Sequence, residues 1–359
     1  MIVNELAVRS LRELSSRLGF AQLGIVGARD SPNFDRFCEW LDRGYSGSMR
    51  YLEDRREAYR HPDYVLENCK SIIMLAMPYA AHPRTQSSKR ASLAQGNKAA
   101  ATVGSGTIAA YAAGRRDYHD LIHERLSEIV TALNRMFPNT RSRGVVDTAP
   151  LLERGFAQLA GLGWIGKNTL LLNRELGSYF FLSAVLTQAD LPATPAWDSD
   201  HCGTCRACLD ACPTDAFVEP HVMNATRCIS YWTIEHRGAI EESMREGIGD
   251  WLFGCDACQT VCPWNRKLEF DLEQDLEPDA WSEKVDCMFW LQLDEATFRA
   301  RFRHTPFWRT RLAGMQRNAM IVAANTRRNE AISVIRRFLG CGDAVLEETA
   351  RWSLEQLTE

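Results

Sequence analysis

The stretch that decides the fold is Cys202-Gly-Thr-Cys205-Arg-Ala-Cys208-Leu-Asp-Ala-Cys212-Pro213. Its cysteines are separated by two, two and three residues, and a proline follows the last one. This spacing is typical of chains that bind 4Fe-4S clusters, because three closely spaced thiolates reach three corners of a cubane while the fourth serves a second cluster. The stretch therefore predicts a ferredoxin-like region with two clusters.

A second half of the pattern lies downstream, where Cys228 is followed at a distance by Cys255-Asp-Ala-Cys258-Gln-Thr-Val-Cys262-Pro263. It repeats the ending of the first half, with its first cysteine moved upstream by an insertion. Eight thiolates suffice for two cubanes, and the crossed arrangement of two-cluster ferredoxins predicts how they divide. One cluster is assigned to Cys202, Cys205, Cys208 and Cys262, and the other to Cys212, Cys228, Cys255 and Cys258.

Structural zinc is the alternative for these cysteines, since a zinc ion takes four thiolates that usually come from two separated CxxC knuckles. A zinc site needs neither a third evenly spaced cysteine nor the CxxxCP ending that both halves share. The remaining cysteines stand alone and are expected to be small buried apolar residues. They are Cys38, Cys69, Cys287 and Cys341.

Length and composition place the chain among globular proteins of two or three domains, with 359 residues of which 45% are hydrophobic. The first twenty residues lack the basic start, apolar stretch and cleavage site of a signal peptide, and no later run approaches a membrane span. We therefore expect a cytoplasmic protein with no membrane partner.

The pattern before the cysteines predicts an α+β domain over residues 1–195. An amphipathic helix is expected over residues 3–18, and a second helix over Tyr118 to Met136. Apolar runs predict strands at Leu23 to Val26, Ser71 to Met77, Gly144 to Val146 and Tyr179 to Leu186. Residues 86–110, rich in Ala, Ser and Gly, are interpreted as a mobile loop.

Prolines in DLPATPAWDSD, from Asp190 to Asp200, predict a domain boundary near residue 195. The ferredoxin-type domain is then expected over residues 196–285. Residues 286–359 look mainly helical, but they hold too few helix pairs for an independent solenoid, so we expect them to pack against the cluster domain.

Charge is distributed unevenly along the chain. Ten arginines and one acid lie between Arg299 and Arg337, which gives this stretch a charge of +9 and leaves −13 on the rest of a chain whose total is −4. One end of the molecule is thus suited to a polyanion. A solvated helical surface with carboxylate partners is the alternative.

Two segments of the first domain combine tight turns with polar groups, residues 146–154 and residues 161–169. The first places Asp147 at the end of a strand. In a dry pocket the pKa of such a carboxyl group would rise and let it act as a general acid. Capping of a helix that begins near Pro150 is the alternative role for Asp147.

The chain resembles the epoxyqueuosine reductases, cobalamin-dependent iron-sulfur enzymes that complete queuosine in tRNA and are related to the corrinoid reductive dehalogenases. The motifs that carry the resemblance occur in order over roughly residues 110 to 330. They are RRDYHDLI, VVDTAPLLERGFAQLAGLGWIGKNTLLLNRELGSYFFL, CGTCRACLDACPT, VEPHVMNATRCISYWTIEHRGAI, GCDACQTVCPWNRK and QRNAMIVAANT.

The resemblance implies a fold of three parts: an α+β cobalamin domain, a ferredoxin-like two-cluster domain and C-terminal HEAT-like helices. It implies an oxidoreductase that removes the epoxide oxygen of epoxyqueuosine at the tRNA wobble position. Its electrons would come from a reduced ferredoxin or flavodoxin, by way of the clusters and cobalamin, and we expect a monomer.

Site residues are also implied by the resemblance, with Asp147 as the proton donor at the cobalamin. The remaining cobalamin contacts implied are Lys167, Asn168, Ser178, Leu182, Ser230 and Asp256. Lys167 could instead be a surface turn residue, and Ser230 could cap the helix that follows it. The expected tRNA contacts are Arg299, Arg301, Arg303, Arg309 and Arg311. Trp308 or Phe307 could stack on a base, with core packing as the alternative.

Four positions depart from the family pattern: Ser183-Ala184 stand where Gly-Glu is common, Asp215 where Gly is usual, and Tyr59 where an arginine is expected. Two rival functions stay open. One is a corrinoid iron-sulfur reductase of a small molecule, and the other is an electron-transfer protein without cobalamin.

Overall fold

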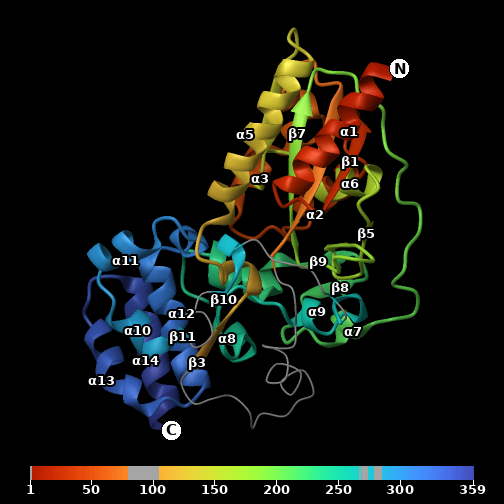
Figure 1. The fold of residues 1–359 in the computed structure, drawn as a ribbon. Helices are drawn as coiled ribbons and strands as arrows, with labels where there is room; N and C mark the ends of the chain where they lie inside the picture. Colours follow the sequence, from red (N-terminus) through yellow and green to blue (C-terminus); the bar gives the residue numbers. More distant parts are fainter. Residues whose placement is uncertain (1, 80–104, 267, 269–273, 279–284) are drawn as a thin grey trace.

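The computed structural model describes residues 2–79, 105–266, 268, 274–278 and 285–359. Figure 1 shows a unit built on a sheet at the top and, below it, the cysteine segment and the C-terminal helices. Most of the predicted mobile loop, residues 86–104, lies outside the described residues. The C-terminal end of this predicted loop was wrong, because Ser105–Ile108 form the strand β3. This strand lies between two partner strands that are distant in sequence, so the local composition does not reveal it.

The upper unit is an antiparallel sheet of four strands in the order β1-β2-β7-β4. Their bounds are β1 (Gln22–Gly27), β2 (Ser71–Pro78), β7 (Phe180–Thr187) and β4 (Ser142–Val145). In the register of this sheet, Met74 of β2 lies opposite Gly24 on one side and Ala184 on the other. All four predicted strands are confirmed, with ends that shift by a residue or two.

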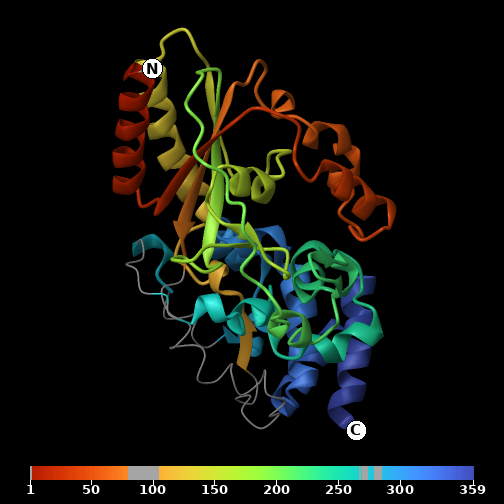
Figure 2. The same cartoon turned by 90° about the vertical axis from the view of Figure 1, so that its right-hand side faces the viewer.

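Helices cover both faces of this sheet. The helices α1 (Ile2–Arg17) and α5 (Tyr118–Met136) pack on one face, and α6 (Glu153–Leu159) packs on the other, as Figure 2 shows. Side chains of β2 alternate between the two cores because neighbouring strand residues point to opposite faces. Ile73 joins the core under α1 and α5, and Ile72 joins the core under α6. An antiparallel sheet with packed helices confirms the predicted α+β class.

Two short helices, α2 (Phe34–Asp42) and α3 (Arg50–Asp54), extend from the sheet toward the cysteine segment. That segment holds the helices α7 (Ala207–Asp210), α8 (Glu242–Ile248) and α9 (Ala257–Thr260). Its paired strands are β8 (Phe217–Glu219) and β9 (Val222–Met223), and a second pair from the first domain, β5 (Trp164–Ile165) and β6 (Leu171–Leu172), lies nearby. Helices α7 and α9 pack together, which brings the two cysteine runs side by side.

A small sheet connects the three predicted domains. Its order is β10-β3-β11, with β10 at Trp251–Phe253 and β11 at Val285–Asp286. The strand β3 comes from the predicted first domain. Its partner β10 comes from the cysteine segment, and its partner β11 lies where that segment ends. The boundaries at residues 195 and 285 remain predictions, but backbone hydrogen bonds cross both of them.

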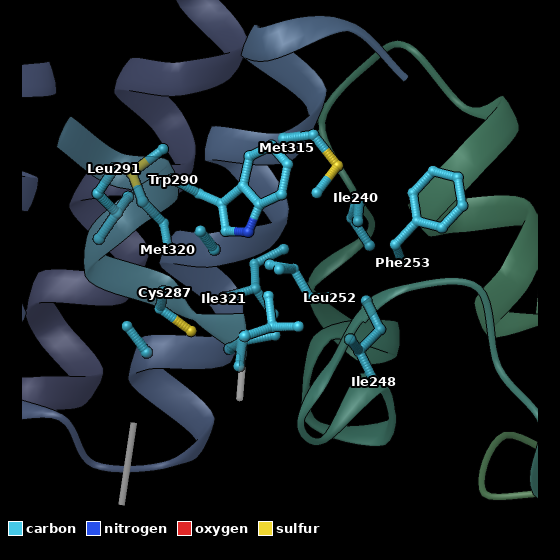
Figure 3. Packing of buried hydrophobic residues seen from close by; sticks show 14 of the residues in the cluster. Ile240, Ile248, Leu252, Phe253, Cys287, Trp290, Leu291, Met315, Met320 and Ile321 are labelled. Carbon is cyan, nitrogen blue, oxygen red and sulfur yellow. The ribbon is translucent and has the colours of Figure 1, made fainter. Parts of the chain in front are cut away.

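The C-terminal segment is helical, as predicted. Its helices are α10 (Cys287–Gln292), α11 (Glu295–Phe302), α12 (Arg311–Asn325), α13 (Ile332–Ile335) and α14 (Ala344–Thr358). Helix α12 is buried along most of its length, between α10, α14, α8 and β10. Figure 3 shows Trp290 and Met315 from these helices in one core with Ile240 and Leu252 from the cysteine segment. The prediction that the helices pack on the cluster region is confirmed.

None of the helices that the structure describes is long and apolar enough to cross a membrane.

Candidate active site

The first four predicted cluster cysteines lie together. Burial, together with the thiolates of Cys208, Cys202 and Cys205, raises the pKa of Cys262 to about 11. Burial also raises the pKa of Cys208, with added contributions from Cys202 and Cys205. Cys205 is the exposed member of this group, and Cys262 is buried. We call these four residues the outer cysteine group.

The other four predicted cysteines form an inner cysteine group: Cys212, Cys228, Cys255 and Cys258. Burial raises the pKa of Cys258 well above its usual range, and the thiolates of Cys228, Cys212 and Cys208 add to this shift. Because Cys208 belongs to the outer group, the two groups are neighbours. All eight are free thiols, and within the described residues no three His, Cys, Asp or Glu side chains converge on a position for a single ion.

Aromatic rings and one lysine surround the outer group. Trp164, which packs with Cys262 and Cys202, contacts the rings of Trp197 and Trp264. The ammonium Nζ of Lys167 donates to the carbonyl oxygens of Gly203 and Cys205 at 2.6 and 2.9 Å. Lys167 is not among the residues that line the neighbouring cavity, and its side chain holds the cysteine loop, so its contact with cobalamin stays a prediction.

A cavity of about 400 Å³ extends from the inner cysteine group to Asp147. Its wall includes all four inner cysteines together with Glu153 and Arg154. Five of the predicted cobalamin contacts also line it, namely Asn168, Ser178, Leu182, Ser230 and Asp256. Apolar and aromatic side chains such as Phe180 and Ile229 make up much of the remaining wall.

Some polar groups in this cavity wall have hydrogen-bond partners within the protein and others do not. Asn168 is buried; its Oδ1 accepts from the amide of Leu170 at 3.3 Å, but its Nδ2 has no hydrogen-bond partner. A buried donor without an acceptor costs about 1 to 3 kcal/mol, so this atom suits a ligand oxygen. Ser230 makes no capping hydrogen bond to the π-helical turn that follows it. The capping alternative for Ser230 is therefore wrong.

Two other predicted contacts also serve the fold. The hydroxyl of Ser178 donates to Gln259 Oε1 at 2.9 Å and accepts from Asn265 Nδ2 at the same distance. The carboxylate of Asp256 accepts from the amide of Ala110 at 2.7 Å and from Gln259 Nε2 at 3.2 Å. These bonds connect α9 and its N-cap residue Asp256 to the segment that precedes β7 and to Ala110.

Asp147 lies at the other end of the cavity in a left-handed backbone conformation with φ of 57°. Its Oδ2 accepts from Tyr118 Oη at 3.2 Å and lies 3.3 Å from His119 Nε2. Its backbone N–H donates to Glu153 Oε1 at 3.0 Å. Helix α6 begins only at Glu153, so the helix-capping alternative for Asp147 is wrong. A non-glycine residue with this φ is strained, as is common at functional sites.

The protonation of this cluster differs from the sequence-based expectation. Burial raises the pKa of Asp147, but the hydrogen bond and charge of His119 and the charge of Arg309 outweigh it, and the net shift is downward. The Asp147 side chain is 54% exposed, so it is not in a dry pocket. A raised pKa was expected only for a dry pocket, and that condition is not met in this structure.

Two neighbours of Asp147 hold protons near neutral pH instead. Burial lowers the pKa of His119, but hydrogen bonds to Asp117 and Asp147 outweigh it and raise the value to about 9. Burial and the charge of Asp147 raise the pKa of Glu153 to about 8. The ring of Tyr118 stacks on His119 and keeps the imidazole in place. Sequence reasoning missed both proton-holding groups, although His119 stands in the motif RRDYHDLI.

Comparison with known proteins identifies the family. Residues 60–148 match the model described as epoxyqueuosine reductase QueG, DUF1730, and residues 201–265 match the 4Fe-4S double cluster binding domain. The epoxyqueuosine reductase of Pseudomonas aeruginosa is 35% identical over 97% of this chain and 94% of its own length. This chain belongs to the epoxyqueuosine reductase family. The Escherichia coli member is 33% identical over 99% of this chain and 91% of its own length.

Solved epoxyqueuosine reductases share the fold. One, crystallised with a tRNA-Tyr epoxyqueuosine-modified stem loop, matches with a TM-score of 0.88 and 30% identity, over 99% of this chain and 91% of the other. Another, from Bacillus subtilis, matches with a TM-score of 0.86, also at 30% identity and with the same coverage, and is described as having its catalytic loop swung out of the active site.

The arginines expected to contact tRNA lie between the start of α11 and the start of α12. Arg309 forms an ion pair with Glu235 at 2.6 Å, Arg301 lies over the ring of Phe289, and Arg303 follows the end of α11. Arg299 and Arg311 lie over Trp308. Carboxylates neutralise part of the arginine-rich stretch, as the alternative of a solvated surface with partners anticipated.

Other residues of that stretch are structural. Arg317 is buried and donates to the carbonyl oxygens of Trp232, His236 and Gly238. Phe307 is fully buried, so core packing is the correct interpretation for its ring. Trp308 stacks on Phe298 but is only partly buried, so its contact with a base stays a prediction.

The departures from the epoxyqueuosine reductase pattern have distinct surroundings. Asp215 adopts φ of 49°, a conformation in which the usual glycine is unstrained. Tyr59 is buried, and Ser183 is buried in β7 with a hydroxyl that has no hydrogen-bond partner. Nothing in the structure explains why serine stands at position 183.

Proposed function

We propose that this chain reduces epoxyqueuosine to queuosine at the wobble position of tRNA. Two electrons and two protons convert the epoxide into a carbon-carbon double bond and one molecule of water. The observation that carries the proposal is that one and the same cavity has Asp147 at one end and the inner cysteine group at the other. The family membership of the chain supports the same reaction.

The residues present fit the cofactors that this reaction requires. Eight thiols in two neighbouring groups suit two 4Fe-4S clusters, with the crossed ligand sets predicted above. The cavity wall suits cobalamin, which is large and partly apolar with amide side groups, because apolar rings adjoin the unpaired Nδ2 of Asn168 and the hydroxyl of Ser230. When bound, the clusters supply one-electron relay and cobalamin supplies a low-valent cobalt able to reduce a carbon-oxygen bond.

The position of the two cysteine groups supports a direction for electron flow. The outer group includes the exposed Cys205, where an external donor can approach, and the inner group lines the cavity. A reduced ferredoxin or flavodoxin is the proposed donor. We further propose that the enzyme acts as a monomer in the cytoplasm, with residues 1–195 binding cobalamin and substrate, residues 196–285 the clusters and residues 286–359 the tRNA.

Protonation of the departing oxygen is assigned to Asp147. An unprotonated alkoxide is a poor leaving group, so a proton must reach this oxygen as its bond to carbon breaks. We assign the store of this proton to His119, because its pKa is raised to about 9 and its Nε2 lies 3.3 Å from Oδ2 of Asp147. Asp147 then acts as the donor at the substrate, and His119 is the group that reloads it.

The test is an anaerobic assay of the protein reconstituted with iron, sulfide and cobalamin, with a chemical reductant and tRNA that carries epoxyqueuosine. Nucleoside mass spectrometry should show conversion to queuosine with a mass loss of one oxygen. Unchanged epoxyqueuosine in the presence of both cofactors would reject the proposal. It would leave the two rival functions, a small-molecule corrinoid reductase or, without cobalt binding, an electron-transfer protein.

A further inference from the structure

A second cavity of about 420 Å³ has a wall that shares no residue with the cavity described above. The segment before and within α3, the turn after Ile234 and the segment that leads into α12 form its wall. Its wall is strongly basic and partly aromatic. The side chains that characterise it are Arg237, Arg309, Arg311, Tyr51, Trp308 and Glu235.

Electrostatic coupling places this basic cavity close to the proton donor. The charge of Arg309 lowers the pKa of Asp147, and the charge of Asp147 contributes to a raised pKa of Tyr51. Arg309 is fixed within the basic cavity, since its guanidinium donates to Glu235 at 2.9 Å and lies 3.4 Å from the hydroxyl of Tyr51. A ligand in this cavity would therefore be a close neighbour of the substrate at Asp147.

The charge of the wall favours an anion. Glu235 compensates one of the three guanidinium groups, Arg309, through a two-pronged ion pair. Arg237 donates to the carbonyl oxygens of Ile234 and Arg309, which fixes its side chain without compensating its charge. Within the described part of the chain, no ion pair joins a carboxylate to Arg311. Two positive charges thus remain at the wall.

Arg311 is held in a position suited to a phosphate. Its guanidinium carbon lies 4.1 Å from the centroid of Trp308, whose ring is stacked on Phe298. The ring covers one face of the guanidinium and leaves its N–H edges for an oxyanion, which arginine binds through two parallel hydrogen bonds. Arg311 also has φ of 65°, a strained conformation for a non-glycine residue, and such strain is concentrated at ligand-binding positions.

We propose that this cavity binds the nucleotide adjacent to the modified one, with its phosphate at Arg311 and Arg237. The inference rests on the proposed function and adds a subsite to it. The modified nucleotide remains joined to this neighbour through one phosphate. Because the charge of Arg309 in the cavity wall is felt at Asp147, that phosphate comes near the cavity when the modified nucleotide is at Asp147. Proteins bind single-stranded RNA loops in this way, with splayed nucleotides and arginine contacts.

The test compares Arg311→Gln with Arg311→Lys and with Arg351→Gln, which removes an exposed arginine from α14, outside the cavity. Affinity for an anticodon stem loop that carries epoxyqueuosine is measured at several salt concentrations, together with turnover. Iron content and melting temperature of each variant show whether it is folded and loaded.

Arg311→Gln should weaken binding about tenfold, as expected for a lost charged hydrogen bond, and reduce the slope of log Kd against log salt by about one. KM should rise while kcat stays nearly constant, because the contact is equally strong in ground and transition states. Arg311→Lys should keep the slope. If Arg311→Gln binds the stem loop with the same affinity and the same salt slope as Arg351→Gln, the subsite is overturned. If Arg311→Gln binds more weakly but keeps the salt slope, the assignment of a phosphate to Arg311 is overturned. Absent conversion by the unmodified protein would reject the proposed function instead, since binding is measured separately.

Discussion

His119 Nε2 lies 3.3 Å from Oδ2 of Asp147, and Nδ1 of the same ring lies 2.7 Å from Oδ1 of Asp117. The imidazole is therefore held between two carboxylates, and it remains protonated well above neutral pH. His119 and Asp147 are thus arranged for proton transfer: Asp147, next to the substrate, is anionic, and His119 beside it carries the proton. This arrangement separates contact with the substrate from storage of the proton.

Asp147→Asn should lose most of the deoxygenation activity while it keeps both clusters and cobalamin. The amide preserves the shape of the side chain but cannot transfer a proton, and general acid catalysis contributes about 10²- to 10⁴-fold to such rates. The measurement is single-turnover formation of queuosine, with iron and cobalt content as controls. Turnover at the rate of the unmodified protein would exclude the acid role of Asp147.

The pH dependence should identify the proton store. As pH rises, Glu153 loses its proton at about 8 and His119 at about 9, in the field of Asp117, Asp147 and Arg309. If His119 supplies the proton, turnover falls as pH passes about 9. Turnover by Glu153→Gln should still fall as pH passes about 9. Turnover by His119→Gln should be slower at neutral pH and should not show this fall. A fall that persists in His119→Gln would contradict the relay.

The same His119 shift affects stability. Because its pKa is raised from 6.5 to about 9 in the folded protein, its contribution to the free energy of unfolding is complete below pH 6.5. The contribution is lost as pH rises to about 9. Denaturant unfolding should therefore show a difference between His119→Gln and the unmodified protein that is large at pH 6 and small at pH 9.5. A constant difference across this range would argue against the carboxylate pairing.

Each cysteine group should hold one cluster. Cys205→Ser in the outer group and Cys228→Ser in the inner group should each lower the iron content from about eight to about four per chain. Cys341→Ser serves as the control and should keep all of the iron, since Cys341 lies outside both groups and is exposed, which shows that its predicted burial was wrong. Loss of all iron, or of none, in both group variants would contradict the two-cluster assignment.

Lys167 and Asn168 are neighbours in sequence, but they should behave differently. Asn168→Leu removes the unpaired buried donor in the cavity and should weaken cobalamin binding about tenfold. Lys167→Met removes the hydrogen bonds to the outer cysteine loop, so it should bind cobalamin normally and release iron faster to a chelator. Equal cobalamin affinities in the two variants would contradict this division of roles.

The sequence predicted the elements whose signal is local. The apolar run Ser71–Pro78 and the amphipathic stretch Tyr118–Met136 became β2 and α5 because their patterns match the cores they enter. The strand Ser105–Ile108 was missed, since its stability comes from distant partners in β10 and β11.

In the candidate site, too, only features with a local sequence signal could be predicted. The cysteine groups could be predicted from spacing, whereas the pKa of Asp147 depends on His119 and Arg309, which the fold brings to it from other elements. Lys167 was assigned to cobalamin from its motif, but a long flexible side chain can reach several places, and only the structure shows that it contacts the cysteine loop.

The most direct test of the central claim is one preparation, purified anaerobically after expression with cobalamin, in which metal content and tRNA conversion are measured together. We expect about eight irons and one cobalt per chain, with epoxyqueuosine converted to queuosine. A preparation with all of the iron and cobalt that leaves epoxyqueuosine-containing tRNA unchanged would contradict it.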